Sequence, residues 1–420
     1  MVTRIPKITH AEFLQSTPVF GQTYLLNSAP LFTAILCVFL LSGPLKLILA
    51  AFSIQTPLDL TLFSAIALVP FLIVGNKLCN KELGALSLLV VFMTYYTARS
   101  LSENSGLYAQ EKLLYSFLNL FTVSVILRQR SFHIKTALWV FSAIGGLFFI
   151  LVLWSVRISF LEGFNSVLPV ANATEVLSEF RGGYLTCALI ITIASFLYQQ
   201  SFPNRSFTLN RVVVGVGCFL IGARGPLVFF IVVLILMFLR QSFQSTRKSA
   251  LKYTVNGLVM VGMLLLLLLT FQEDNKILEL IMPSVQRFSN LTSFTGESID
   301  VRVDQLNFVY EQALFFENVL LGHGTGSFGV LYAQADTRMY PHNFLAEVFF
   351  ETGLIGLFML VLFLFLCFGG GPGKNYFWWI ALLIFLNAMK TYAFEDLRLL
   401  FAFLTLTLLS RPVTTSHERL

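Results

Sequence analysis

Charged residues are scarce in this chain. Asp, Glu, Lys and Arg make up only 12% of its 420 residues, whereas 56% are hydrophobic and the mean hydropathy is +0.78. Soluble globular domains carry about 25% charged residues, so this composition excludes an ordinary soluble domain. A membrane helix needs about 20 mostly apolar residues. The chain is therefore expected to be all-α and a polytopic integral membrane protein.

Long polar stretches are also few, and about twelve apolar segments predict about twelve transmembrane helices. The predicted spans are 24–43, 58–75, 84–101, 112–127, 136–156, 184–200, 212–223, 225–239, 253–271, 342–367, 375–391 and 398–410. Only Arg224 separates the seventh span from the eighth, so this pair is a candidate broken or re-entrant hairpin. The expected domains are 1–271 with helices 1–9, a large loop at 272–341, and 342–420 with helices 10–12 and a tail.

Cysteine and histidine are rare, with five of each. The cysteines show neither a disulfide framework nor the spacing of metal ligands. No Walker loop or dinucleotide fingerprint is present, so neither a metal site nor a cofactor is predicted. The N-terminal segment carries Arg4 and Lys7 without the apolar core and cleavage site of a removable signal peptide.

Basic residues gather on one set of predicted loops, and such loops stay cytoplasmic. These residues are Lys77, Lys81, Arg128, Arg130, Lys135, Arg205, Arg211, Arg240, Arg247, Lys248 and Lys252. Both termini are therefore predicted to be cytoplasmic. Segments 158–183 and 272–341, with Arg224 and His342, are predicted to face outward, which is the periplasm in a bacterial inner membrane. The net charge of +6 is then mostly a topology signal, and no nucleic-acid partner is expected.

The 272–341 loop is too long for a connector and too rich in Leu, Phe and Val to be disordered. Within it, Ile277–Met282 and Val303–Phe316 have an apolar spacing that predicts short amphipathic helices at the membrane surface. These helices would roof a cavity open to the outer leaflet.

His342 lies in Pro341-His342-Asn343, where this loop meets an apolar span. An imidazole titrates near neutral pH, so a histidine at the water-facing end of a membrane helix is suited to moving protons. The alternative is that His342 and Asn343 cap the helix that follows. His323, the other histidine predicted outside, lies among glycines that would hold it loosely.

Three arginines are also predicted on the outer side. A guanidinium at membrane depth is costly unless it lines a polar cavity or meets an anion. Arg224 has small neighbours that would let a phosphate approach the backbone, although it could also simply end two helices. Arg302 stands between Asp300 and Asp304, so a surface ion pair is its alternative. Arg181 precedes two glycines and would bind either substrate or anionic head groups.

Residues 322–326, Gly-His-Gly-Thr-Gly, look like a phosphate loop but lack the following lysine and the preceding strand. They predict a flexible turn whose backbone shapes a pocket, with Gly324 and Gly326 as substrate contacts. Towards the C-terminus, Glu395, Asp396 and Arg398 form a cluster that contacts a substrate or pairs internally.

Four features in this order resemble one family. They are Arg224 in a small-residue break, Arg302 in a long external loop, LLGHGTGSFG at 320–329, and PHNFLAEVFFETGLIGL at 341–357. The chain resembles the bacterial O-antigen ligase and O-antigen polymerase family, along its whole arrangement of spans and most strongly between 222 and 357. The resemblance implies a GT-C type membrane glycosyltransferase that moves a glycan from undecaprenyl diphosphate to an acceptor sugar in the periplasm, metal-independent and inverting.

The resemblance also implies roles for single residues. Arg224 and Arg302 would bind and neutralise the diphosphate, and His342 would act as the base or orient the acceptor hydroxyl. Asn343 would position His342 or the sugar. Fixed guanidiniums suit a leaving group that gains negative charge. The implied partners are the lipid-linked donor, a glycan or lipid A core acceptor, the lipid bilayer and a chain-length regulator.

Two departures favour a polymerase over a ligase. The position a turn after Arg302, often aromatic in ligases, is Asp304-Gln305-Leu306, and the residues after Asn343 are more apolar than in many ligases. O-antigen ligase is the alternative, and a transporter or flippase for lipid-linked sugars and a non-catalytic assembly partner are rivals. No internal repeat supports the transporter. Some of the 44 phenylalanines are hypothesised to line a groove for the prenyl tail beside Arg224.

Overall fold

The computed structural model describes residues 28–52, 54, 59–156, 183–202, 207–244, 297–312, 316–372 and 376–410. This part of the chain is helical and contains no strand, so the all-α prediction is confirmed for it. The helices are α3 (Ala29–Leu40), α4 (Ser42–Ala51), α5 (Leu60–Ile73), α6 (Asn80–Arg99), α7 (Tyr108–Gln129), α8 (Ile134–Val156), α10 (Tyr184–Ser201), α11 (Phe207–Leu220), α12 (Arg224–Gln244), α15 (Glu297–Gln312), α16 (Phe316–Leu321), α17 (Ser327–Ala333), α18 (Phe344–Phe368), α19 (Phe377–Thr391), the 3₁₀ turn η2 (Phe394–Asp396) and α20 (Arg398–Leu409). The predicted span 253–271, the predicted helix Ile277–Met282 and Arg181 lie outside the described residues.

Two helices are long and apolar enough to cross a membrane, α8 over Ile134–Ser155 and α18 over Phe344–Phe368. The bent pair α3 and α4 passes the same test as one span. Shorter apolar helices fall below this length: α19, with 15 residues, rises about 23 Å, whereas the hydrocarbon core is about 30 Å thick. The protein is therefore an integral membrane protein, and the count of about twelve spans stays a prediction.

Two helix breaks differ from the prediction. The helix expected to run unbroken over 24–43 stops at Leu41, and α4 leaves at 72°. Arg224 does not separate two helices but is the first residue of α12, because 221–223 form the break. Gly222 there has a φ of 69°, and the Ala223 N–H closes α11 by donating to the Cys218 carbonyl at 2.9 Å. Arg224 therefore lies at the positive end of a helix dipole.

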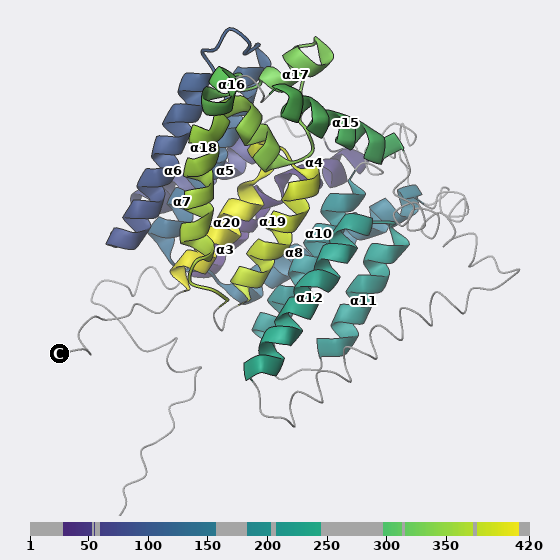
Figure 1. Cartoon of the computed structure of the whole chain (residues 1–420). Coiled ribbons are helices and arrows are strands. Elements are labelled where there is room, and N and C mark those ends of the chain that lie inside the picture. The colour runs from purple at the N-terminus through teal and green to yellow at the C-terminus, as the bar shows by residue number, and fades with distance from the viewer. Residues whose placement is uncertain are drawn as a thin grey trace, which may run out of the picture.

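The centre of the bundle is α20, which packs against α7, α18 and α19 (Figure 1). Every side chain from Leu400 to Leu408 is buried. A helix that is buried on all sides must be enclosed by other helices, so α20 needs no contact with lipid although it is short. Around it, α6, α7 and α18 lie to one side, and α10, α11 and α12 lie beyond α19 (Figure 1). Helix α8 packs against α3, α4 and α10, and its Phe141 ring contacts Phe403 of α20.

Helices α15, α16 and α17 lie across one end of this bundle (Figure 1). Phe308 and Val309 anchor α15 in an aromatic cluster, where the Phe308 ring centroid is 5.9 Å from those of Phe328 and Phe350. The predicted helix Val303–Phe316 is thus confirmed through Gln312, although it begins at Glu297. The outward face of α15 exposes further apolar side chains: Val301, Val303, Leu306 and Tyr310.

Helix α18 is interrupted at Gly353, which has a φ of 65° and non-helical geometry. The interruption frees backbone carbonyls for partners outside the helix. The carbonyls of Phe350 and Glu351 accept the N–H groups of His323 and Gly324, at 2.8 and 3.0 Å. The 322–326 segment predicted as a flexible turn is therefore hydrogen-bonded to α18, and the expectation of a loose loop is wrong.

A fully buried ion cluster joins α7 to the first half of α18. Lys112 pairs with Glu347 and, at 2.5 Å, with Glu351. The second carboxylate oxygens accept hydrogen bonds from the Phe394 N–H and the Tyr96 hydroxyl, each at 2.7 Å. Buried charges are tolerated only when paired and hydrogen-bonded in this way, so the cluster fixes the relative positions of α6, α7, α18 and η2.

Substituting Lys112 by Ala should destabilise the protein strongly, because two buried carboxylates would lose their counter-ion. Breaking a buried pair from one side typically costs about 3–5 kcal/mol. The matched control is Lys46→Ala, since Lys46 pairs with Asp59 near the surface and exposed pairs contribute about 1 kcal/mol or less. Thermal unfolding of the detergent-solubilised variants measures the loss of stability in each. Equal losses of stability in Lys112→Ala and Lys46→Ala would contradict a structural role for the buried ion cluster.

Candidate functional site

His342 lies in the turn that precedes α18, half-buried and with a φ of 51°. Left-handed backbone is uncommon for residues with a side chain and occurs often at functional positions. One ring N–H donates to the Thr391 carbonyl. Nδ1 is buried and has no hydrogen-bond partner among the described residues. The Tyr340 ring packs edge-on at 4.8 Å, and its hydroxyl donates to the same carbonyl at 3.3 Å.

Asn343 is the N-cap of α18. Its Oδ1 accepts the backbone N–H groups of Leu345 and Ala346, each at 3.1 Å. The capping alternative thus holds for Asn343, which fixes the backbone directly beside His342. A contact between Asn343 and a sugar stays a prediction.

Cationic side chains from three distant parts of the chain meet around the end of α19. Arg302 of α15 interacts electrostatically with His342, and both Arg302 and Arg224 interact with Lys390. A Cβ atom placed on Gly225 would lie 3.4 Å from Nζ of Lys390, so the lysine packs on the first turn of α12. The structure therefore brings Arg224, Arg302 and His342 together, with Lys390 among them. We call these four residues the cationic cluster.

Two members of the cationic cluster carry a positive charge without a carboxylate partner in the part of the chain that the structure describes. Within the described ranges, Arg302 and Lys390 form no ion pair with a carboxylate, and Arg302 pairs with neither Asp300 nor Asp304. The surface ion pair considered for Arg302 is thus not formed there. Neighbouring cations at the end of a membrane helix favour an anionic ligand.

The environment of His342 lowers its pKa from the ordinary value. Burial is the largest cause, repulsion from the Arg302 guanidinium adds to it, and the hydrogen bond to Thr391 opposes both. The imidazole is therefore neutral at neutral pH. With one nitrogen donating to Thr391, the Nδ1 lone pair is available to accept a proton.

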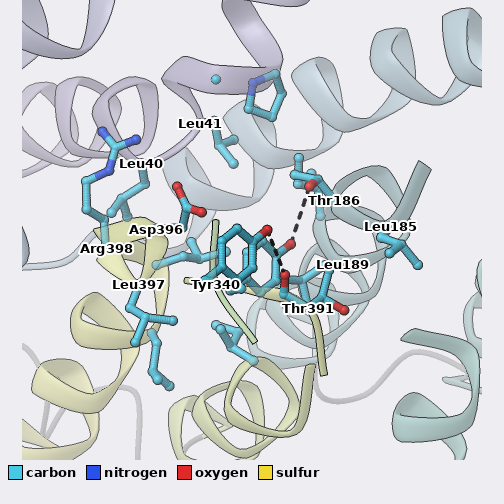
Figure 2. A pocket seen from close by; sticks show the side chains of 17 residues that line it. Leu40, Leu41, Leu185, Thr186, Leu189, Tyr340, Thr391, Asp396, Leu397 and Arg398 are labelled. Atoms are coloured by element: carbon cyan, nitrogen blue, oxygen red, sulfur yellow. Dashed lines mark hydrogen bonds between the residues drawn. The ribbon is translucent and has the colours of Figure 1, made fainter. Parts of the chain in front are cut away.

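A cavity of about 340 Å³ lies beside His342, with Tyr340 and Thr391 on its wall (Figure 2). Tyr392 and Thr186 also line the cavity, and the Tyr392 hydroxyl lies 3.3 Å from Oγ1 of Thr186. The cavity is within the size range of small-ligand pockets. Its remaining lining is mostly aliphatic, with a charged end: Leu40, Leu41, Gly43, Pro44, Leu185, Leu189, Ile190, Ile384, Asp396, Leu397, Arg398, Leu399 and Leu400. No phenylalanine lines it, so the hypothesised phenylalanine groove is not this cavity and stays a prediction.

The acidic residues near the C-terminus pair with Arg338, which the sequence had not singled out. Arg338 Nε lies 3.0 Å from Glu395, and its terminal nitrogen lies 2.6 Å from Asp396. Arg398 instead lies over the Phe39 ring, 5.1 Å from its centroid. The predicted pairing within the Glu395, Asp396 and Arg398 cluster is thus not formed, because both acids pair with Arg338.

Gly324 and Gly326 occupy tight positions with φ of 110° and 76°. A Cβ on Gly324 would lie 2.5 Å from that of Ser102, and the Gly326 N–H donates to the Glu351 carboxylate at 2.9 Å. These contacts explain by packing alone why glycine occupies both positions. A contact of Gly324 or Gly326 with the substrate stays a prediction. His323 stacks on Phe350 at 4.6 Å and is buried, so the expectation that it is loosely held is wrong.

Sequence reasoning missed Lys390 and the Lys112 ion cluster. A signal for the ion cluster was available, because Glu347 and Glu351 stand four residues apart inside an apolar span and so share one face of a helix. Carboxylates at that depth require a cationic partner. In the described part of the chain, no group of three or more His, Cys, Asp or Glu side chains could hold a metal ion. Metal independence stays a prediction.

The candidate membrane spans indicate an integral membrane protein, and the cations beside His342 are suited to an anionic ligand and a proton acceptor. Residues 209–361, which include Arg224, Arg302 and His342, match the family model described as O-antigen ligase. The predicted resemblance to the O-antigen ligase family is thus confirmed over these residues. This supports a function of the O-antigen ligase or polymerase type, on a lipid-linked glycan and an acceptor. No curated protein gives a significant match to the chain.

Replacing Arg302 by Gln should raise the pKa of His342, because it removes a neighbouring positive charge. NMR titration of histidine-labelled protein in nanodiscs measures the change. The matched control is Arg99→Gln, since Arg99 acts on His323 in the same way. Arg302→Gln should raise only the pKa of His342, and Arg99→Gln only the pKa of His323. If either substitution shifted both pKa values, or neither, the described geometry would be contradicted.

Proposed function

We propose that this protein is a membrane glycosyltransferase of surface polysaccharide (O-antigen) biosynthesis. It transfers a glycan from undecaprenyl diphosphate to an acceptor sugar on the periplasmic side of the bacterial inner membrane. The observation that carries the proposal is the meeting of Arg224, Arg302 and His342, which are separated by up to 118 positions in the sequence, around the end of α19. A guanidinium pair beside a neutral imidazole matches the two needs of this reaction, a bound diphosphate and a proton acceptor.

The proposed reaction is a single displacement. The acceptor hydroxyl attacks the anomeric carbon and gives its proton to Nδ1 of His342. The bond from the anomeric carbon to the diphosphate oxygen breaks, and its electron pair stays on the diphosphate. Arg224 and Arg302 stabilise this growing charge without a metal ion. Attack opposite the leaving group inverts the anomeric centre.

Between the two members of the family, we favour the repeat-unit polymerase. Of the three residues at the position that is often aromatic in ligases, Gln305 is buried against the bundle, whereas Asp304 and Leu306 face outward. No aromatic ring therefore stands there to stack on an acceptor. O-antigen ligase, which joins the polymer to lipid A core, is the alternative and agrees with the description of the matched family. A transporter or flippase is the second alternative, and it has no need of a histidine with a free lone pair.

The proposed orientation puts the cationic cluster in the periplasm and both termini in the cytoplasm. It also places α15–α17 outside, as a loop domain whose partners include a chain-length regulator. Ser102, just after the C-terminal end of α6, donates a hydrogen bond to the His323 carbonyl, so segment 322–343 begins at that end of the helix. The N-terminal end of α6 lies about 30 Å away, because the helix has 20 residues. The two ends of α6 are thus suited to reporting the orientation.

Cysteine labelling tests this orientation directly. Thr337→Cys is exposed beside the cationic end, and a membrane-impermeant maleimide should label it in intact spheroplasts. The internal control is native Cys79, which is exposed at the start of α6, whereas the other four cysteines are buried. Cys79 should react only after permeabilisation. The reverse pattern would invert the proposed topology.

The glycan profile of a deletion strain tests the function. Complementation with His342→Ala should lower transfer by about 10²- to 10⁴-fold, the usual contribution of a general base, and Arg224→Ala should also abolish long glycan. Single repeat units on lipid A core would identify the polymerase. Long chains that accumulate on undecaprenyl diphosphate would identify the ligase.

Asp336→Asn serves as a matched control on the same side of the protein. Asp336 accepts hydrogen bonds from the Leu107 and Tyr108 N–H groups, outside the cationic cluster. A normal glycan profile from His342→Ala and Arg224→Ala at normal expression would overturn the catalytic proposal and favour the transporter.

A further inference from the structure

We infer that Lys390 is a third cation of the donor site, which binds the terminal phosphate of the lipid diphosphate and stabilises the charge that appears there as the glycan leaves. This inference rests on the proposed function and adds to it a residue that neither the motifs nor the family match singles out.

Lys390 is an electrostatic neighbour of both arginines of the cationic cluster. Its stem lies against Gly225, where a Cβ would stand 3.4 Å from both Cδ and Nζ, and Gly225 directly follows Arg224. The next residue, Thr391, holds His342 through its carbonyl. Lys390 is therefore close to Arg224, the residue proposed to bind the phosphate, and is adjacent in sequence to the residue that holds the proposed proton acceptor.

A simpler role for a lysine in the last turn of a helix is to stabilise the helix dipole. The contacts of Lys390 favour another role. Among the described residues its ammonium forms no ion pair, and it packs on the positive N-terminal turn of α12. Arg224 and Arg302 are its electrostatic neighbours. Lys390 and Arg302, neither of which has a carboxylate partner among the described residues, repel each other unless an anion lies near them.

The charge of the substrate accounts for a third cation. In the donor, the diphosphate bridges the prenyl chain and the sugar, so each phosphate carries one negative charge. When the sugar leaves, the terminal phosphate becomes a monoester, whose second pKa is about 6, and gains a further charge. Two guanidiniums match the donor, and Lys390 matches the charge that arises in the transition state. Its removal should therefore lower kcat more than it raises KM.

Binding of two lipids by the purified full-length protein in nanodiscs tests this role. The probes are undecaprenyl diphosphate, which has the extra charge, and its terminal methyl ester, which keeps the diester charge of the donor. Lys390→Gln should weaken binding of undecaprenyl diphosphate by roughly 10- to 100-fold, the range for a charge-assisted hydrogen bond. It should weaken binding of the methyl ester much less. Lys390→Arg keeps the charge and should restore most of the affinity.

Lys135→Gln is the matched control, because Lys135 is an exposed lysine in the first turn of α8. It should leave the affinity for both lipids unchanged. Unchanged affinities in Lys390→Gln would overturn the inference. Equal losses of affinity in Lys390→Gln and Lys390→Arg would also overturn it, because they would show that Lys390 acts through packing and not through its charge.

The two proposals fail in different ways. If the wild-type protein binds both lipids and Arg224→Ala abolishes glycan transfer while Lys390→Gln binds as wild type does, only the role of Lys390 is lost. If the wild-type protein binds neither lipid and Arg224→Ala has a normal glycan profile, the proposed function itself fails, and the inference with it.

Discussion

The pairing of Lys112 with Glu347 and Glu351 is the interaction on which the rest of the structure depends. Three charges in an apolar bundle are tolerable only in one arrangement, so this pairing fixes the first half of α18 against α7. Its influence extends to the site, because Glu347 accepts the Phe394 N–H and the Asn119 amide donates to the Phe394 carbonyl. The chain just before Phe394 is thereby anchored. That segment begins at Thr391, which holds His342, so a buried ion cluster determines where the imidazole stands.

The pairing of the acidic residues explains why cations near His342 lack carboxylate partners in the described part of the chain. Among the described residues at the end of the bundle that carries α15–α17, Lys112 pairs with Glu347 and Glu351, and Arg338 pairs with Glu395 and Asp396. No carboxylate of that group is left for Arg302 or Lys390. The positive charge near His342 is therefore a consequence of pairing elsewhere, and it lowers the pKa of the imidazole at the same time. The proposed anion binding and the proposed proton acceptance would thus have a common electrostatic origin.

The sequence predicted the helices and the charged candidates, but not the breaks or the partners. Long apolar runs specify membrane helices by themselves, and a charge in apolar surroundings such as Arg224 stands out without a structure. The interruption at Gly353 depends on a distant contact, since a Cβ there would lie 2.2 Å from the Leu320 carbonyl oxygen. Lys390 resembles any lysine that ends a membrane helix. Only the packing of α12 on α19 shows that it adjoins Arg224.

The break at Gly353 divides α18 into parts that belong to different surroundings. The first part carries the cap beside His342 and the buried carboxylates, and it is tied to α7. The second part exposes Leu354, Phe358 and Phe365, side chains suited to contact with lipid tails. Because the helical geometry is interrupted at Gly353, we expect a change in the tilt of the second part, as the bilayer thins or thickens, to be transmitted only weakly to the turn that carries His342. The geometry of the proposed site would then depend little on the thickness of the membrane.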